Sequence, residues 1–254
     1  GGGVRHGAGV GRRGVVGGGA AGGGVGWAGR SGGRVRLLGG GTEAAAGDLE
    51  AAIGNVRALR QRHQTVASGI IDPAWRNAVL VELDREFDDL ERIVGALVVL
   101  GEVSPRWYDT IAATGELLSS RIVAAALTAH GHTAAWVDAR TVIVTSDQFM
   151  AAAPLFDPTN AALRAVIEPL TMAGTIAVLG GFVGATDKGV TTTLGRGGSD
   201  LTGAIVGAAL GADEIQIWTD VDGMLTADPR VVSAPHVASH LSFAEASELA
   251  YFGA

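Results

Sequence analysis

A glycine-rich segment with one arginine and one aspartate is the strongest candidate for chemistry. It reads Thr191-Thr-Thr-Leu-Gly-Arg-Gly-Gly-Ser-Asp200, and helix-forming residues follow it. Glycines let the backbone approach an anion closely, and the start of a helix offers free N–H groups. Arg196 adds a fixed cation that suits a carboxylate or a phosphate. The plain structural alternative is a glycine turn followed by a helix that Asp200 caps.

A second candidate reads Trp218-Thr-Asp-Val-Asp-Gly223 and continues as Thr226-Ala-Asp-Pro-Arg230. We expect a strand over residues 214–218, so Thr219 and Asp220 should directly follow its carboxyl end. Ligands of open parallel α/β sheets bind beyond that end of the strands, which makes this segment a candidate nucleotide contact. A plain connection from a strand to a turn is the alternative.

The third candidate is Gly115-Glu-Leu-Leu-Ser-Ser120, which is weak alone because an acid near a helix start is ordinary helix chemistry. The chain has no Gly-Lys-Ser/Thr phosphate loop, and its six histidines are scattered, so we assign no metal ligands and no catalytic histidine. A run of acids between residues 82 and 91 points around a helix rather than converging, and we interpret it as a solvated face.

The elements that must position these segments follow from hydrophobic spacing, from runs of helix-forming residues and from a proline that suits a first helical turn. Helices are expected from Asp48 to about His63, from Pro73 to about Leu97, from Pro105 to Asp109 and from Thr114 to Ala129, within Pro154–Leu170, and over Asp200–Leu210. Strands are expected over Ala134–Val137, Val142–Val144, Thr175–Leu179 and Glu214–Trp218. Strands that alternate with helices predict an α/β fold with a largely parallel sheet covered on both faces.

Composition bounds the class of protein. The 254 residues are 47% apolar and 18% charged, which allows a sizeable core, and the net charge of −7 argues against a general nucleic-acid binder. No uninterrupted apolar run reaches the roughly 18 residues of a membrane span, so we expect no membrane-spanning protein. Cysteine is absent, which excludes disulfides, thiolate metal sites and cysteine nucleophiles.

The first 42 residues differ from the rest of the chain, because they hold 20 of the 40 glycines, six arginines and no acid. Gly9, Gly11 and Gly14 match a dinucleotide fingerprint, but no strand precedes them. An Arg/Gly nucleic-acid arm and a transit peptide are two further alternatives. We interpret residues 1–42 as a Gly/Arg-rich low-complexity leader, non-native or disordered, such as a misread frame would produce. We expect residues 1–34 to lack a stable central strand.

The three motifs, in this order, resemble those of aspartate kinases, which are members of the amino-acid kinase family. Trp136-Val-Asp-Ala-Arg140 and the segment from Phe243 to Ala254 also look like that family, so the resemblance covers roughly residues 43–254. It implies a three-layer αβα sandwich with a mainly parallel central sheet. It also implies that residues 44–101 are the helical insertion that distinguishes aspartate kinases from shorter relatives.

The resemblance implies transfer of a phosphoryl group from ATP to the side-chain carboxylate of L-aspartate, with Mg²⁺ arriving on ATP. Arg196 would then hold the α-carboxylate of aspartate and Glu116 its ammonium, while Asp200 would organise the transfer. Ser199 and Thr42 would be further substrate contacts. The nucleotide contacts would be Thr219, Asp220, Gly223, Leu225 and Arg230, with Leu225 replacing a tyrosine usual in many members. The resemblance implies a cytoplasmic enzyme that binds neither nucleic acid nor membrane, and it leaves a homo-oligomer open.

Departures from the family pattern bear on activity. The family begins with a strand ending in Lys-Phe-Gly-Gly-Thr-Ser, whose lysine contacts the transferring phosphates, whereas the single lysine of this chain is Lys188. A Lys-Val-Leu-His-Pro segment and the regulatory domains would follow Ala254. We therefore expect residues 43–254 to be a partial kinase domain with impaired activity. The alternatives are a non-catalytic nucleotide- or amino-acid-binding remnant, or a kinase acting on glutamate or acetylglutamate.

Overall fold

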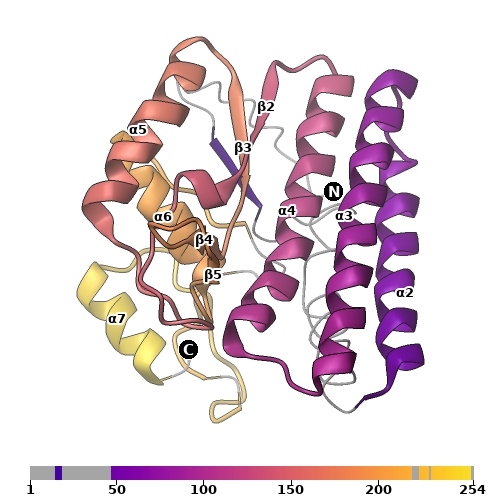
Figure 1. Ribbon diagram of the computed structural model, residues 1–254. Coiled ribbons are helices and arrows are strands. Elements are labelled where there is room, and N and C mark those ends of the chain that lie inside the picture. Colours follow the sequence, from indigo (N-terminus) through magenta and orange to yellow (C-terminus); the bar gives the residue numbers. More distant parts are fainter. Residues whose placement is uncertain (1–14, 19–46, 219–222, 229, 253–254) are drawn as a thin grey trace. The chain divides into compact units, whose positions relative to one another are not determined.

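The computed structural model describes most of the chain, namely residues 15–18, 47–218, 223–228 and 230–252. The chain divides into two units, residues 1–217 and residues 218–254, and each is described by itself. The first unit contains the sheet and most of the helices (Figure 1).

Two long helices open the described part of the first unit. Helix α2 (Leu49–Ala67) begins after Asp48, whose carboxylate accepts the N–H of Ala51 at 3.0 Å. Helix α3 (Pro73–Leu100) begins with a proline after the capping residue Asp72, and it ends at Gly101 with φ of 70°. Caps of this kind satisfy the unpaired backbone groups of helix ends, which explains why the sequence predicted both starts closely.

Helix α4 (Pro105–Ala129) is one continuous helix where two segments were predicted, and it is buried on both faces. Its residues Ile111, Leu118 and Ile122 pack into an apolar core with α2 and α3. Ala113 and Leu117, on the other face, join the core beneath the sheet.

By length and composition α4 could also cross a membrane, which the search for uninterrupted apolar runs did not indicate. In the structure, 67% of its apolar 18-residue stretch is buried. A core helix that separates two apolar clusters accounts for this hydropathy.

The central sheet has three parallel strands in the order β1-β3-β2, with bounds Val15–Gly18, Ile176–Gly180 and Ala134–Val137. Val137 pairs with Leu179, so the carboxyl ends of β2 and β3 lie at the same edge. Strand β1 was not predicted. It pairs with β3 from Val15 opposite Ala177 and lies at an edge of the described sheet, so the interpretation of residues 1–42 as disordered is wrong for these four residues.

Helices cover both faces of this sheet, as the predicted αβα sandwich requires. Helix α4 lies on one face, and α5 (Phe156–Met172) and α6 (Gly198–Leu210) lie on the other (Figure 1). The chain continues from β2 through the short helix η2 (Ala139–Thr141). Strands β4 (Val183–Ala185) and β5 (Thr191–Thr193) form an antiparallel hairpin between β3 and α6.

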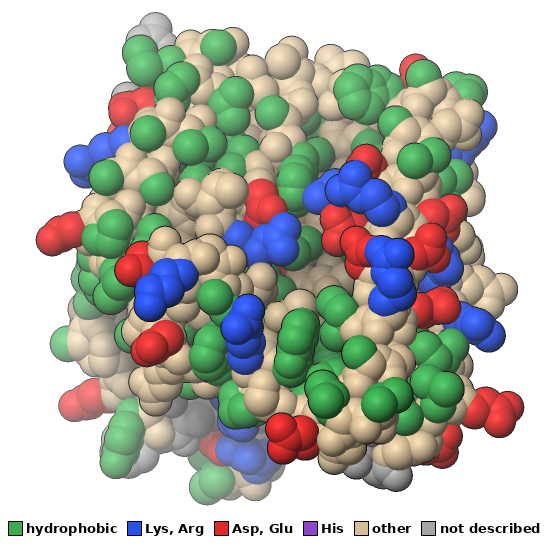
Figure 2. Space-filling view, in the orientation of Figure 1, with side chains coloured by type: hydrophobic (Ala, Val, Ile, Leu, Met, Phe, Trp, Pro, Cys, Tyr) green, Lys and Arg blue, Asp and Glu red, His purple; other side chains and the backbone are tan. Residues whose placement is uncertain are grey.

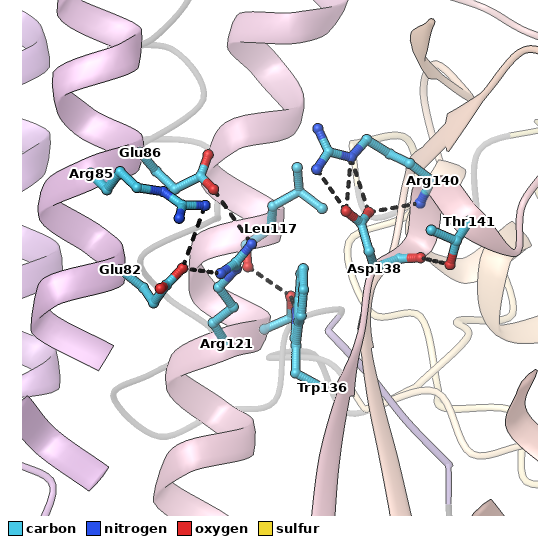
Figure 3. Close-up of polar contacts among 10 residues, drawn as sticks. Glu82, Arg85, Glu86, Leu117, Arg121, Trp136, Asp138, Arg140 and Thr141 are labelled. Carbon is cyan, nitrogen blue, oxygen red and sulfur yellow. Dashed lines mark hydrogen bonds and ion pairs between the residues drawn. The ribbon is translucent and has the colours of Figure 1, made fainter. Parts of the chain in front are cut away.

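The acids of α3 form ion pairs rather than a merely solvated face. Arg121 of α4 lies between Glu82 and Glu86, with N···O distances of 2.8 and 3.4 Å, and its guanidinium stacks on Trp136 of β2 at 3.9 Å (Figure 3). Arg60 of α2 pairs in the same way with Asp84, Asp88 and Glu91. Acidic and basic side chains therefore alternate over these helices (Figure 2). Arg121 therefore ties the predicted helical insertion to α4, the helix next to the sheet, and Arg60 ties the two helices of the insertion to each other.

Two predicted strands are absent from the described structure. Residues 214–218 form an exposed coil rather than a strand, although Ile215 and Ile217 alternate with polar residues as they would in a strand. Residues 142–144 contain only an isolated bridge, from Val144 to Ala185. Strand formation requires a neighbouring edge as well as an alternating pattern.

The second unit contains helix α7 (Phe243–Phe252) and an isolated antiparallel bridge between Leu225 and Val237. The start of α7 is closed by a capping box, because the carboxylate of Glu245 accepts the N–H of Ser242 at 2.8 Å and the hydroxyl of Ser242 accepts the N–H of Glu245 at 3.3 Å.

Candidate functional site

Two glycines at the carboxyl end of β3 bring two predicted site residues together. A Cβ atom on Gly180 would lie 3.0 Å from the carbonyl oxygen of Glu116, and one on Gly181 would lie 3.0 Å from the Cα of Ser199. Only glycine allows the end of this strand to approach both α4 and the start of α6 so closely. Glu116 and Ser199, which are 83 residues apart in sequence, therefore flank the same two-residue segment.

Glu116 is held on the sheet-facing side of α4 by its own motif. It is 7% exposed, and the hydroxyl of the neighbouring Ser119 donates to its carbonyl oxygen at 3.2 Å. Ser120 is also buried, accepts the indole N–H of Trp136 at 2.9 Å and donates to the carbonyl of Leu117 at 3.0 Å. Ser120 of the Gly-Glu-Leu-Leu-Ser-Ser motif thus links α4 to β2, and Glu116 lies about one turn before it.

The glycine-rich segment forms the turn between β5 and α6. Gly195 and Gly197 adopt φ of 77° and 72°, the left-handed region that favours glycine, and Arg196 between them is exposed. Helix α6 begins at Gly198 with Gly197 as its capping residue. Asp200 is therefore the third residue of the helix, and the alternative that it serves only as the N-cap is wrong.

The start of α6 is joined directly to the residue that follows Gly181. Phe182 has φ of 71°, which is uncommon for a bulky residue, and its N–H donates to the hydroxyl of Thr202 at 3.0 Å. Thr202 donates in turn to the carbonyl of Gly198 at 2.7 Å, and the N–H of Leu194 donates to the carbonyl of Phe182 at 2.9 Å. These bonds hold the two ends of the Arg196 turn against the end of β3.

Backbone strain at such a position is typical of functional sites, where surrounding structure must over-determine the conformation. Phe182 and the pair Gly180–Gly181 were not among the predicted site residues. The only signal in the sequence was the Gly-Gly that bounds the predicted buried strand.

The predicted nucleotide contacts belong to the second unit. Thr219 and Asp220 lie outside the described residues, as does the predicted substrate contact Thr42 in the first unit. Leu225 takes part in the bridge to Val237.

Next to that bridge, Gly223 has φ of 141°, and Arg230 is exposed. The guanidinium of Arg230 forms a forked pair with Asp228, with N···O distances of 3.0 and 2.5 Å. These hydrogen bonds from Arg230 lower the pKa of the Asp228 carboxyl and raise that of the guanidinium. Asp228 therefore orients the guanidinium to which the resemblance gives a nucleotide contact.

Lys188 is exposed at the tip of the β4–β5 hairpin, where Thr186 and Val190 close the turn. The opposite end of the hairpin is the one that joins Phe182 to Leu194, so Lys188 lies away from the glycine pair. Within the described residues, no group of three or more His, Asp or Glu side chains could hold a metal ion.

The fold and these residues define the class of protein. The sequence profile of the amino acid kinase family matches residues 15–254, from the first residue of β1, and this chain belongs to that family. Its curated relatives include lysine-sensitive aspartokinase 3 of Escherichia coli (strain K12), 40% identical over 173 residues, which are 66% of this chain and 38% of the relative. Chloroplastic aspartokinase 3 of Arabidopsis thaliana is 39% identical over 179 residues, which are 70% of this chain and 32% of the relative. The chain thus spans less than two fifths of these relatives.

Solved structures support the same family assignment. The crystal structure of E. coli aspartokinase III in complex with aspartate and ADP matches with a TM-score of 0.73 and 33% identity, covering 80% of this chain and 44% of that one. The same enzyme in complex with lysine and aspartate gives a TM-score of 0.73 at 28% identity, covering 94% and 56% of the two chains. The resemblance to aspartate kinases and the fold that it implied are confirmed.

Proposed function

We propose that this chain is a catalytic portion of an aspartate kinase. It would transfer the γ-phosphoryl group of ATP to the side-chain carboxylate of L-aspartate and give 4-phospho-L-aspartate, the first step towards lysine, threonine and methionine. We further propose a cytoplasmic location and no nucleic-acid or membrane partner.

The observation that carries this proposal is the approach of Gly180 and Gly181 to Glu116 and Ser199. An amino acid presents an ammonium and a carboxylate on one carbon, so a site for it needs an anion and a cation close together. Glu116 would take the ammonium, and Arg196, in the turn that leads to Ser199, would take the α-carboxylate. Asp200 in the next turn would organise the transfer.

The chemistry needs little beyond positioning and charge neutralisation. The aspartate carboxylate is already a nucleophile, so no general base is required, which agrees with a site built without histidine or cysteine. An oxygen of that carboxylate forms a bond to the γ-phosphorus while the bond from phosphorus to the bridging oxygen breaks, and ADP leaves with that electron pair. Bringing two anions together is the main difficulty, so cations and helix N–H groups should supply most of the catalysis.

The start of α6 would suit a phosphate of ATP, because the N–H groups of a first helical turn bind anions. Its capping residue Gly197 has no side chain that would occupy these N–H groups. By the resemblance, Thr219, Asp220, Gly223, Leu225 and Arg230 would contact the nucleotide. Mg²⁺ usually binds through phosphates, water and one or two carboxylates. The described residues, which hold no acidic cluster, therefore suit Mg²⁺ brought by ATP, and it would neutralise phosphate charge.

We propose that turnover is low. The family match begins at β1, and no lysine occurs in residues 15–42, where by the resemblance the family would have its phosphate-binding lysine. Loss of one preorganised donor of this kind typically costs about 10²–10³-fold in rate. This absence also favours the second candidate function, a binding remnant without catalysis.

Hydroxamate formation from MgATP with aspartate, glutamate or acetylglutamate tests the proposal. Of the three substrates, we expect only aspartate to give turnover, and we expect that turnover to be weak. It should increase greatly when Lys-Phe-Gly-Gly-Thr-Ser replaces the six residues after Val16. Preference for glutamate or acetylglutamate would overturn the substrate assignment. Equal turnover of the two chains would overturn the argument from the missing lysine, and no turnover in either would favour the binding remnant.

A further inference from the structure

Asp109, near the start of α4, is a buried carboxylate that none of the sequence motifs explains. Asp109 is 1% exposed, although it lies only four residues after the helix begins at Pro105. Burying a carboxylate is costly unless hydrogen bonds compensate for the lost water. The surrounding donors therefore indicate what the residue does.

Three donors from two distant segments converge on this carboxylate. One oxygen accepts the N–H of Met150 at 2.9 Å and the N–H of Thr193 at 3.1 Å. The other accepts the hydroxyl of Thr193 at 2.6 Å. These donors are 41 and 84 residues away in sequence, so Asp109 joins α4, the segment around Met150 and the end of β5.

The two segments that Asp109 holds also support the turn that carries Arg196. Thr193 is the last residue of β5, three residues before Arg196, and its carbonyl accepts the N–H of Ala152 at 2.9 Å. Gly195 packs so closely against Met150 that a Cβ there would lie 3.1 Å from the Met150 carbonyl oxygen. Met150 itself has φ of 70°, so its conformation depends on the contacts around it.

Asp109 and Glu116 share one helix and one side of it, since seven residues are about two turns, or roughly 10 Å along the axis. Helix α4 thus carries Glu116 and, through Asp109, fixes the strand end from which Arg196 extends. We propose that Asp109 is a positioning residue that sets the location of Arg196 relative to Glu116. This inference rests on the proposed function, in which those two side chains hold the α-carboxylate and the ammonium of aspartate.

Variants at Asp109 separate its role in positioning Arg196 from any effect of its own negative charge. Asp109→Leu keeps the number and branching of the side-chain heavy atoms and removes all three hydrogen bonds. Asp109→Asn can keep them, because its oxygen can accept the two N–H groups while its NH₂ donates to the hydroxyl of Thr193. The matched control is Thr159→Val, since Thr159 is fully buried and its hydroxyl bonds both the N–H and the carbonyl of Val144, each at 3.0 Å.

The first measurement is amide hydrogen exchange. Asp109→Leu should raise exchange in residues 149–152 and 193–197 above that of the rest of the first unit, whereas Asp109→Asn and Thr159→Val should leave these segments protected. If Asp109→Leu does not fold, Thr193→Val removes only the hydroxyl bond and should raise exchange in the same segments to a smaller extent. Unchanged exchange there in the folded variant would overturn the inference.

The second measurement compares calorimetric titrations of L-aspartate and 3-aminopropanoate, which lacks the α-carboxylate that Arg196 would hold. We expect Asp109→Leu to reduce the preference for L-aspartate about tenfold, because a hydrogen bond to a charged group contributes about that much or more. Asp109→Asn should retain the preference. An equal loss for both ligands would overturn the inference, and so would a loss in Asp109→Asn as large as in Asp109→Leu. If the unaltered chain binds no L-aspartate, the proposed function fails and hydrogen exchange alone decides the role of Asp109.

Discussion

Replacing Gly181 by alanine should disturb the junction between β3 and α6 through a single methyl group. Gly181 has no left-handed φ, so alanine can adopt its backbone conformation and the effect comes from packing alone. The new Cβ would lie 3.0 Å from the Cα and 3.1 Å from the Cβ of Ser199. Neither atom is the flexible end of a side chain, so α6 must move. Overpacking of this kind typically costs about 1–3 kcal/mol.

The assay is urea denaturation of Gly181→Ala beside Gly54→Ala. Gly54 is exposed in α2, and no atom lies within 4 Å of where its Cβ would be. The control should therefore gain about 0.5–1 kcal/mol in free energy of unfolding from the higher helix propensity of alanine. Gly181→Ala should lose stability and bind L-aspartate more weakly, because Ser199 moves. A Gly181→Ala variant with unchanged stability and unchanged aspartate binding would refute the close approach on which the site is built.

Two further predictions concern the helical segment. Burial lowers the pKa of His63, with Arg62 adding to the effect, so the contribution of His63 to stability should be constant above about pH 7. Below an unfolded pKa of about 6.5 this contribution should fall by up to about 1.4 kcal/mol per pH unit. Urea denaturation of His63→Leu at several pH values should show a smaller loss, and an identical pH profile would contradict this. Arg121→Gln should lower the free energy of unfolding by about 1–3 kcal/mol, because it removes two ion pairs and the stacking on Trp136. The side chain of Arg85 is 66% exposed, so the control Arg85→Gln should change the free energy of unfolding by less than about 0.5 kcal/mol. Equal costs in the two variants would show that the Arg121 contacts contribute nothing.

Local signals in the sequence predicted much of the fold. Helix-forming residues after Asp48 and a proline at residue 73 that suits a first helical turn indicated two helix starts, and the spacing of apolar residues up to Leu97 defined the second helix. The alternating pattern of residues 214–218 misled, because a strand also needs a partner edge. Strand β1 escaped prediction because four residues in a glycine-rich segment carry almost no hydrophobic periodicity.

The candidate site was predictable only where its residues lie in motifs. Glu116 and Ser199 were named from segments whose order resembled one family, and the structure brings both to the end of β3. Asp109 could not be found in the same way, since its hydrogen-bond partners are 41 and 84 residues distant in sequence. A single aspartate near the start of a helix forms no sequence pattern. The positive φ of Phe182 likewise arises from tertiary contacts and not from its residue type.

The most direct test of the central claim, that Glu116 belongs to an aspartate-binding site, is a calorimetric titration of L-aspartate into the chain and into Glu116→Gln. The amide keeps the shape of the side chain but removes the charge that would face the ammonium. We predict saturable binding that weakens about tenfold or more in the variant, as expected for loss of a charge-assisted hydrogen bond. Equal affinity of the two proteins, or no saturable binding by the unaltered chain, would contradict the account.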